Sequence, residues 1–255
     1  MYILRSLEAV KIVTKFHLWP RRGIITVVMS YSKLLDRLRK VGESVVIRKR
    51  SHVAYQGEVP RYAYYLLDGS VKAYIIAADG SEIIADIYSK HSLLPVAWLS
   101  RASPTAIFYY EAISDVRAVR FSRDGFEQVV SENSDAKDDY LKYLADAQTA
   151  QLLRSAWLCQ STADRKVCYT LYLLVYRYGV EREPGQYMIP IPLTHEIIGK
   201  FIGQSRENTA KTIKSLSDEK IFSYESKTYT VDLPRLEGYL GEEGFRELVV
   251  SYDLL

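Results

Sequence analysis

Side chains able to bond the edges of nucleic-acid bases stand together at residues 206–211, which read RENTAK. The guanidinium of Arg206 can donate both arms of its fork to guanine O6 and N7, and the carboxylate of Glu207 can accept from the amino group of cytosine. Asn208 and Lys211 follow on the same outward side of an expected helix. These residue types at this spacing are typical of a helix that reads base edges in the major groove of DNA.

Two short helices joined by a glycine turn would position these side chains, over residues 193–216. Thr194 and Ser205 each carry a side-chain oxygen that can accept from an unpaired amide at the start of a helix. Gly203 ends the first helix, where glycine tolerates the left-handed backbone, and Gly199 lets the second helix approach closely. Apolar residues recur on one face of both helices, at Ile197, Ile198, Phe201, Ile202, Ala210, Ile213 and Leu216.

This arrangement predicts a helix-turn-helix, and the alternative is an amphipathic helical hairpin with a solvated outer face. Residues 222–231 predict a short β-hairpin, which is either a wing beside the second helix or a sheet edge that covers the helices. His195, at the start of the first helix, approaches a phosphate or contacts nothing. The predicted DNA-binding residues are Thr194, Ser205, Arg206, Glu207, Asn208, Thr209, Lys211, Lys214 and Lys227.

The segment SRENTAK, Ser205 to Lys211, resembles the recognition helix of the Crp/Fnr family of bacterial transcription regulators, whose pattern is Ser-Arg-Glu-Thr-Val-x-Arg. The resemblance implies that Arg206 and Glu207 take the base-reading positions. Lys211 stands where many members carry arginine, and lysine cannot form the planar fork. The resemblance also implies a cytoplasmic homodimer that binds double-stranded DNA and RNA polymerase, without a membrane partner.

The first half of the chain has a strand pattern rich in β-branched and aromatic residues. Strands are expected at residues 45–47, 62–67, 70–76, 82–88, 106–112 and 116–121. Turn signals with Gly57, Asp68-Gly69 and Asp79-Gly80 separate them, and an Asp-Gly pair between two strands predicts a hairpin. Short strands at this spacing predict a barrel or roll. The order of turns resembles the double-stranded β-roll of cyclic-nucleotide-binding domains, in which Gly57 and Gly69 match structural turn glycines.

A long apolar stripe follows the strands and predicts one helix over residues 135–159. It is either a coiled dimer seam or a helix that packs on its own β-roll. The family resemblance favours the dimer, and dimeric readers of DNA engage half-sites about one turn, ~34 Å, apart.

The predicted fold class is therefore α+β, with an N-terminal jelly-roll-like β-roll, a long dimerisation helix and a C-terminal winged helix-turn-helix. An N-terminal extension, disordered or loosely docked, occupies residues 1–30. The other predicted boundaries are 31–132 for the sensor roll, 133–160 for the dimerisation helix, 161–240 for the DNA-binding domain and 241–255 for a tail or helix.

The sensor function of the roll is less well specified by the sequence. A cyclic-nucleotide phosphate needs amides at a helix start and a fixed arginine fork, commonly as Gly-Glu followed by Arg-Ser/Thr-Ala. Residues 91–104 contain no Gly-Glu, and Arg101 is followed by Ala-Ser-Pro, which argues against cAMP or cGMP. Arg101, Trp98 and Tyr109 are the candidates for an effector pocket, the alternatives being a solvated arginine and core aromatics.

Neither metal nor catalytic residues are identified. The two cysteines, Cys159 and Cys168, are expected to be buried, inert thiols, and the absence of cysteine before them argues against an iron–sulfur cluster. His52 and His91 are isolated, which gives no support to a metal site or to the alternative of a cupin-like enzyme. A ligand-free regulator controlled by a protein partner stays open. The sequence has no run of ~18 apolar residues for a membrane span.

Overall fold

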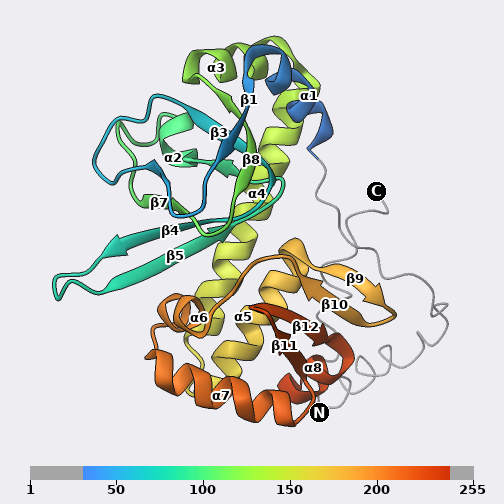
Figure 1. Ribbon diagram of the computed structural model, residues 1–255. Helices are drawn as coiled ribbons and strands as arrows, with labels where there is room; N and C mark the ends of the chain where they lie inside the picture. The colour runs from blue at the N-terminus through green and yellow to red at the C-terminus, as the bar shows by residue number, and fades with distance from the viewer. Residues whose placement is uncertain (1–30, 242–255) are drawn as a thin grey trace, which may run out of the picture.

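The computed structural model describes residues 31–241 of the 255-residue chain, so the predicted extension 1–30 and the tail from residue 242 lie outside the described residues. A β-roll and a helical DNA-binding-like module are joined by a long helix (Figure 1). The α+β fold class and the order roll, long helix, helix-turn-helix are confirmed.

Two four-stranded antiparallel sheets form the roll, in the orders β1-β8-β3-β6 and β2-β7-β4-β5. Their strands are β1 (Glu43–Ile47), β2 (His52–Ala54), β3 (Ala63–Asp68), β4 (Val71–Ile76), β5 (Glu82–Tyr88), β6 (Leu93–Leu94), β7 (Tyr109–Ala112) and β8 (Val116–Phe121). Side chains such as Leu66, Val71, Leu94 and Val116 are buried between the sheets. The six expected strands are present, while β2 and β6 are too short for their periodicity to stand out in the sequence.

The two Asp-Gly pairs do different things. Asp79-Gly80 joins β4 to β5, which pair in register from Val71↔Tyr88 to Ile76↔Glu82, as the hairpin signal predicts. Asp68-Gly69 joins β3 to β4, which lie in different sheets, so the predicted hairpin is wrong there. Gly69 has a φ of 82°, and a Cβ on it would lie 2.2 Å from the carbonyl oxygen of Asp115. Glycine therefore allows the chain to pass from one sheet to the other against the β7–β8 turn.

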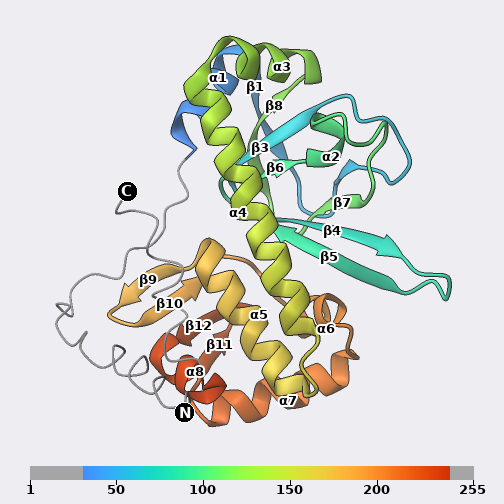
Figure 2. The same cartoon turned by 180° about the vertical axis from the view of Figure 1, so that it is seen from behind.

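Four helices accompany the roll: α1 (Ser32–Val41), α2 (Val96–Leu99), α3 (Arg123–Glu132) and α4 (Ser134–Leu158). The first, third and fourth pack together through Leu34, Leu38, Phe126 and Tyr140. The predicted long helix is confirmed as α4, which runs from this packed end of the roll down to the second module (Figure 2).

The second module consists of α5 (Ala163–Tyr178), β9 (Val180–Glu183), β10 (Gln186–Ile189), α6 (His195–Ile202), α7 (Arg206–Asp218), β11 (Phe222–Glu225), β12 (Thr228–Asp232) and α8 (Leu233–Leu240). Its four strands form one sheet in the order β11-β12-β10-β9. The hairpin expected at residues 222–231 is present: β11 contacts α7, and Tyr229 and Val231 are buried in the core of the module.

Candidate nucleic-acid interface

The two helix starts are fixed by the residues that the sequence singles out. Thr194 Oγ1 accepts from the Ile197 amide at 3.1 Å, and Ser205 Oγ accepts from the Asn208 amide at 3.2 Å. Gly203 ends α6 with a φ of 70°. A capping side chain satisfies an amide that the helix cannot. The turn between α6 and α7 is therefore defined at both ends by local hydrogen bonds.

The contact between the two helices is close at Gly199. A Cβ on this residue would lie 2.7 Å from the Gln204 carbonyl oxygen and 3.0 Å from Thr209 Oγ1. Thr209 is fully buried, and its hydroxyl donates to the Ser205 carbonyl oxygen at 2.8 Å. The prediction that Thr209 contacts DNA is wrong, because its position faces α6 and the core rather than the outer side of α7.

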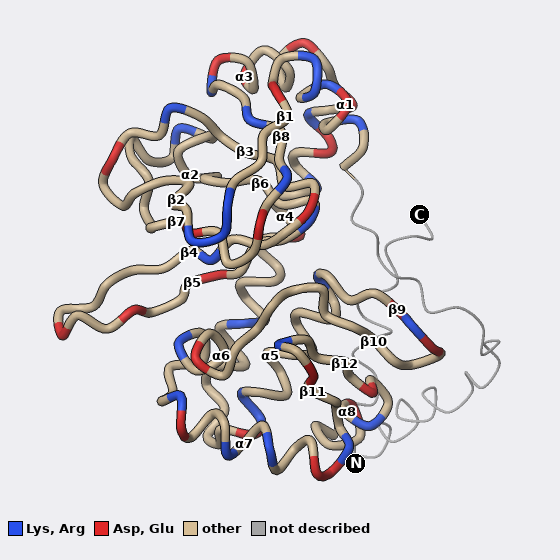
Figure 3. The backbone as a smooth tube through the Cα atoms, in the orientation of Figure 1, with Lys and Arg blue, Asp and Glu red and all other residues tan. Residues whose placement is uncertain are grey.

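The outer side of α7 carries the remaining predicted side chains. Five of them are exposed and form no side-chain hydrogen bond or ion pair with another described residue: Arg206, Glu207, Asn208, Lys211 and Lys214. Both basic and acidic residues lie along this helix, which is at the end of the molecule opposite to α1 and α3 (Figure 3). Their donors and acceptors are consequently available to a ligand outside the protein.

A hollow of about 470 Å³ separates the starts of α6 and α7. It is lined by His195, Ser205, Arg206, Glu207 and Ala210. The His195 ring packs against Tyr224 of β11, with ring centroids 4.8 Å apart, and burial together with the Arg206 charge lowers the pKa of His195. The hollow thus opens beside Arg206 and Glu207, where amides at a helix start favour an anion.

The tip of the β11–β12 hairpin lies beside the start of α6. Lys227 is exposed, with a φ of 69°, and its carbonyl oxygen accepts from the Leu193 amide at 2.9 Å. This backbone bond holds the hairpin tip next to Thr194. Lys227 therefore lies on the wing as expected, with its ammonium group free of an ion pair among the described residues.

The three predicted effector residues have different surroundings in the structure. Trp98 is only 4% exposed, lies in the core beneath α3 and is covered by the Arg123 guanidinium, 4.1 Å from its ring. Tyr109 stacks on Tyr74, with ring centroids 5.2 Å apart, on the side of the roll that faces the second module.

Arg101 is occupied by a neighbour. It follows α2 with a φ of 60°, and its Nε and Nη2 donate to the two carboxylate oxygens of Glu127. This bond is the largest cause of the lowered pKa of Glu127. The sequence could not reveal the pairing, because the partners are separated by 26 positions in sequence.

The two cysteines differ in environment. Burial raises the pKa of the Cys168 thiol to about 12, but Cys159 is exposed at the end of α4, so the expectation of two buried thiols is wrong for Cys159. Within residues 31–241, no group of three or more His, Cys, Asp or Glu side chains is placed to hold a metal ion. No helix in that same range is long and apolar enough to cross a bilayer.

Comparison with known proteins gives two family matches. The family described as cyclic nucleotide-binding domain matches residues 44–133, which contain the strands of the roll apart from the first residue of β1. The family described as Crp-like helix-turn-helix domain matches residues 165–239, from α5 into α8. The two matches follow one another along the chain, and the whole of α4 lies between them.

The chain matches individual relatives over most of the length of those relatives. The chain is 27% identical over 187 residues to the cAMP-activated global transcriptional regulator CRP of Pasteurella multocida, covering 71% of this chain and 86% of that protein. It is 24% identical to the global nitrogen regulator of a Nostoc species, covering 71% and 82%. A cyclic nucleotide-binding domain containing protein from Listeria monocytogenes has the same fold, with a TM-score of 0.67, 13% identity and coverage of 80% and 99%.

Proposed function

The chain belongs to the Crp/Fnr family of transcription regulators, and from that premise we propose that it is a homodimer that reads a two-fold-symmetric operator with α7. The observation that carries this proposal is the exposed outer side of α7, whose base-bonding groups have no partner among the described residues. Arg206 and Glu207 would read base edges, with Asn208 and Lys211 beside them. Thr194, Ser205, Lys214 and Lys227 would face the DNA backbone.

The long helix α4 supports the homodimer. Leu141 and Leu152 are exposed on it, at 53% and 62%. Because they are eleven residues apart, they lie about three turns apart on one face of the helix. Apolar side chains along one helical face associate with those of a second helix. The division into sensor roll (31–132), dimerisation helix (133–160) and DNA-binding domain (161–240) belongs to the same proposal.

The test of the DNA function is a selection from randomised duplex oligonucleotides with the full-length protein, followed by gel-shift titration of the selected sequence. We expect an inverted repeat to be selected, with affinity that falls steeply as salt rises because phosphate contacts release counterions. Sedimentation equilibrium should give a dimer, and Leu152→Lys should weaken it. A monomer that enriches no sequence would refute the proposal.

The effector is proposed to be something other than a cyclic nucleotide held by Arg101, because Nε and Nη2 of that guanidinium already donate to the Glu127 carboxylate. Calorimetric titration with cAMP and with cGMP should show no binding at micromolar concentration. Native mass spectrometry of protein purified from its host would then identify a retained small molecule. A cytoplasmic location and contact with RNA polymerase complete the proposed role, and a co-purification of polymerase with the DNA-bound dimer would test the latter.

A further inference from the structure

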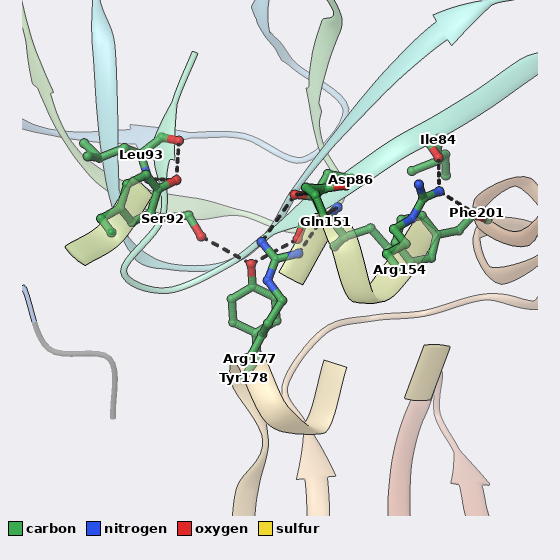
Figure 4. Close-up of polar contacts among 11 residues, drawn as sticks. Ile84, Asp86, Ser92, Leu93, Gln151, Arg154, Arg177, Tyr178 and Phe201 are labelled. Atoms are coloured by element: carbon green, nitrogen blue, oxygen red, sulfur yellow. Dashed lines mark hydrogen bonds and ion pairs between the residues drawn. The ribbon is translucent and has the colours of Figure 1, made fainter. Parts of the chain in front are cut away.

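A buried ion pair joins the roll to the second module. Asp86 of β5 and Arg177 in the last turn of α5 form a bidentate contact, with Nη1 2.6 Å from Oδ1 and Nη2 3.3 Å from Oδ2. Their side chains are only 8% and 10% exposed. Gln151 of α4 adds a third element, since its Nε2 donates to Asp86 Oδ2 at 2.9 Å (Figure 4). One carboxylate is thus shared by the roll, the long helix and the second module.

A second arginine links the same three parts. Nη2 of Arg154, on α4, donates to the carbonyl oxygen of Ile84 in β5 at 3.1 Å and to that of Phe201 in α6 at 2.9 Å. Its guanidinium also lies 4.2 Å from the centre of the Phe201 ring. Figure 4 shows both arginines reaching the edge of β5 from the two helices. We call Asp86, Gln151, Arg154 and Arg177 the junction.

Further contacts flank the junction. Tyr178 Oη donates to the Ile87 carbonyl oxygen at 3.1 Å, again from α5 to β5. Lys200 of α6 lies between Glu82 of β5, at 3.3 Å, and Glu196 of its own helix, at 2.7 Å. The module that carries α7 therefore contacts one strand of the roll through polar groups of both α5 and α6.

The junction differs from the ion pairs on the surface of the roll. Arg117 and Asp68 are 67% and 65% exposed, so water can replace either partner when the pair separates. Separation of Asp86 from Arg177 would instead leave two buried charges without each other, which is strongly unfavourable. A bidentate contact also restricts orientation as well as distance. The junction consequently stabilises the second module in the position on β5 and α4 that these contacts define.

We propose that the junction sets the position of α7 relative to α4, and thereby the spacing between half-sites that the dimer accepts. This inference rests on the proposed function, in which two copies of the chain associate symmetrically through α4. The distance between the two α7 helices then depends on how each second module is held on its own α4. The junction residues do not touch DNA in this proposal; they are positioning residues.

The experiment measures the affinity of the full-length protein for a series of selected operators that differ only in spacer length. Each base pair added moves one half-site by ~3.4 Å along the axis and turns it by about 35°. The wild type should prefer one spacer over those two base pairs longer or shorter by about tenfold, the size of effect that one mismatched base pair typically has.

Three junction variants, Asp86→Asn, Arg154→Met and Arg177→Lys, should bind all spacers within about threefold of one another while selecting the same half-site sequence, because base contacts are retained. Arg117→Gln removes an exposed pair of the same roll and should keep the wild-type preference. Hydrogen exchange of residues 82–87 and 198–202 should be faster in the junction variants only.

A folded junction variant that keeps the sharp wild-type spacer preference would overturn the inference. Should Asp86→Asn fail to fold, Arg154→Met and Arg177→Lys decide the question, because each removes contacts without removing the carboxylate. Wild-type protein that binds its half-site but accepts every spacer equally would also overturn the inference and leave the DNA function intact. Wild-type protein that binds no selected duplex would instead refute the proposed function.

Discussion

Two arginines next to helix ends, Arg101 in the roll and Arg206 in the second module, differ in whether the side chain has a bonding partner within the fold. Arg101 follows α2 and gives both donors of its fork to Glu127. Arg206 begins α7, is exposed, and its side chain makes no hydrogen bond or ion pair with a described residue. The same contrast extends to Trp98, which is covered by Arg123, and to Lys211, which has no partner among residues 31–241. The comparison teaches that a side chain able to bind a ligand indicates a site only where the fold leaves it without a bonding partner of its own.

The largest effect that would sharpen this comparison is expected for Trp98→Ala. Because Trp98 is almost fully buried in the core beneath α3, truncation should lower the free energy of unfolding by ~3–5 kcal/mol. Urea unfolding of the full chain measures it, with Tyr55→Ala, at a 47% exposed position, as the control that changes little. If Trp98→Ala is as stable as wild type but no longer retains a small molecule, Trp98 lines an effector pocket.

The second prediction concerns Arg206→Ala. Loss of the fork should weaken binding to the selected operator by ~1–3 kcal/mol and relax base preference at one position, while unfolding is unchanged. Lys214→Ala is the matched control, because removing an ammonium group that is proposed to contact phosphate should weaken all duplexes equally and reduce the salt slope by ~1. If wild type and Arg206→Ala discriminate equally between operator and scrambled duplex, the exposed Arg206 does not read bases.

A smaller effect is expected for Ser205→Ala. The Asn208 amide loses its acceptor, so α7 should be destabilised by ~1 kcal/mol and its first amides should exchange faster. Ser215→Ala, at an exposed position later in the same helix, should have no such effect on residues 206–209. Unaltered exchange at the start of α7 in Ser205→Ala would show that packing rather than the cap holds Arg206 and Glu207 in place.

The smallest effect is expected for Arg101→Gln. An exposed ion pair contributes little, because water and salt screen it, so the melting temperature should not change measurably. Operator affinity, and its response to small molecules extracted from cells, should also match wild type. A variant that folds normally but loses regulation of DNA binding would mean that the Glu127 contact opens to admit an anion.

Local signals explain what the sequence predicts correctly. Caps at Thr194 and Ser205, the left-handed Gly203 and the hairpin at Asp79-Gly80 depend on atoms within a few residues of one another. Their energetics are therefore encoded in short segments. The helix predicted over residues 135–159 is confirmed as α4 to within one residue at each end, but its buried face consists of Ala136, Tyr140, Tyr143 and Ala150 rather than of one long apolar stripe.

Long-range contacts explain what the sequence does not predict. The crossing at Gly69 depends on Asp115, the state of Arg101 depends on Glu127, and the burial of Thr209 depends on how α6 crosses α7. The pair Asp86 and Arg177 is separated by 91 positions and gives no periodic signal. A single acidic residue in a strand reads as an ordinary exposed position until the partner that buries it is known.

The close crossing of α6 and α7 at Gly199 and Thr209 has an evolutionary consequence. The inward positions of α7 hold the angle between the helices, while its outward positions have no structural duty that the described contacts reveal. Substitutions outside can therefore accumulate without loss of folding. Proteins with this fold can acquire new target genes through substitutions at a few outward positions of α7, while the buried Gly199 and Thr209 are retained.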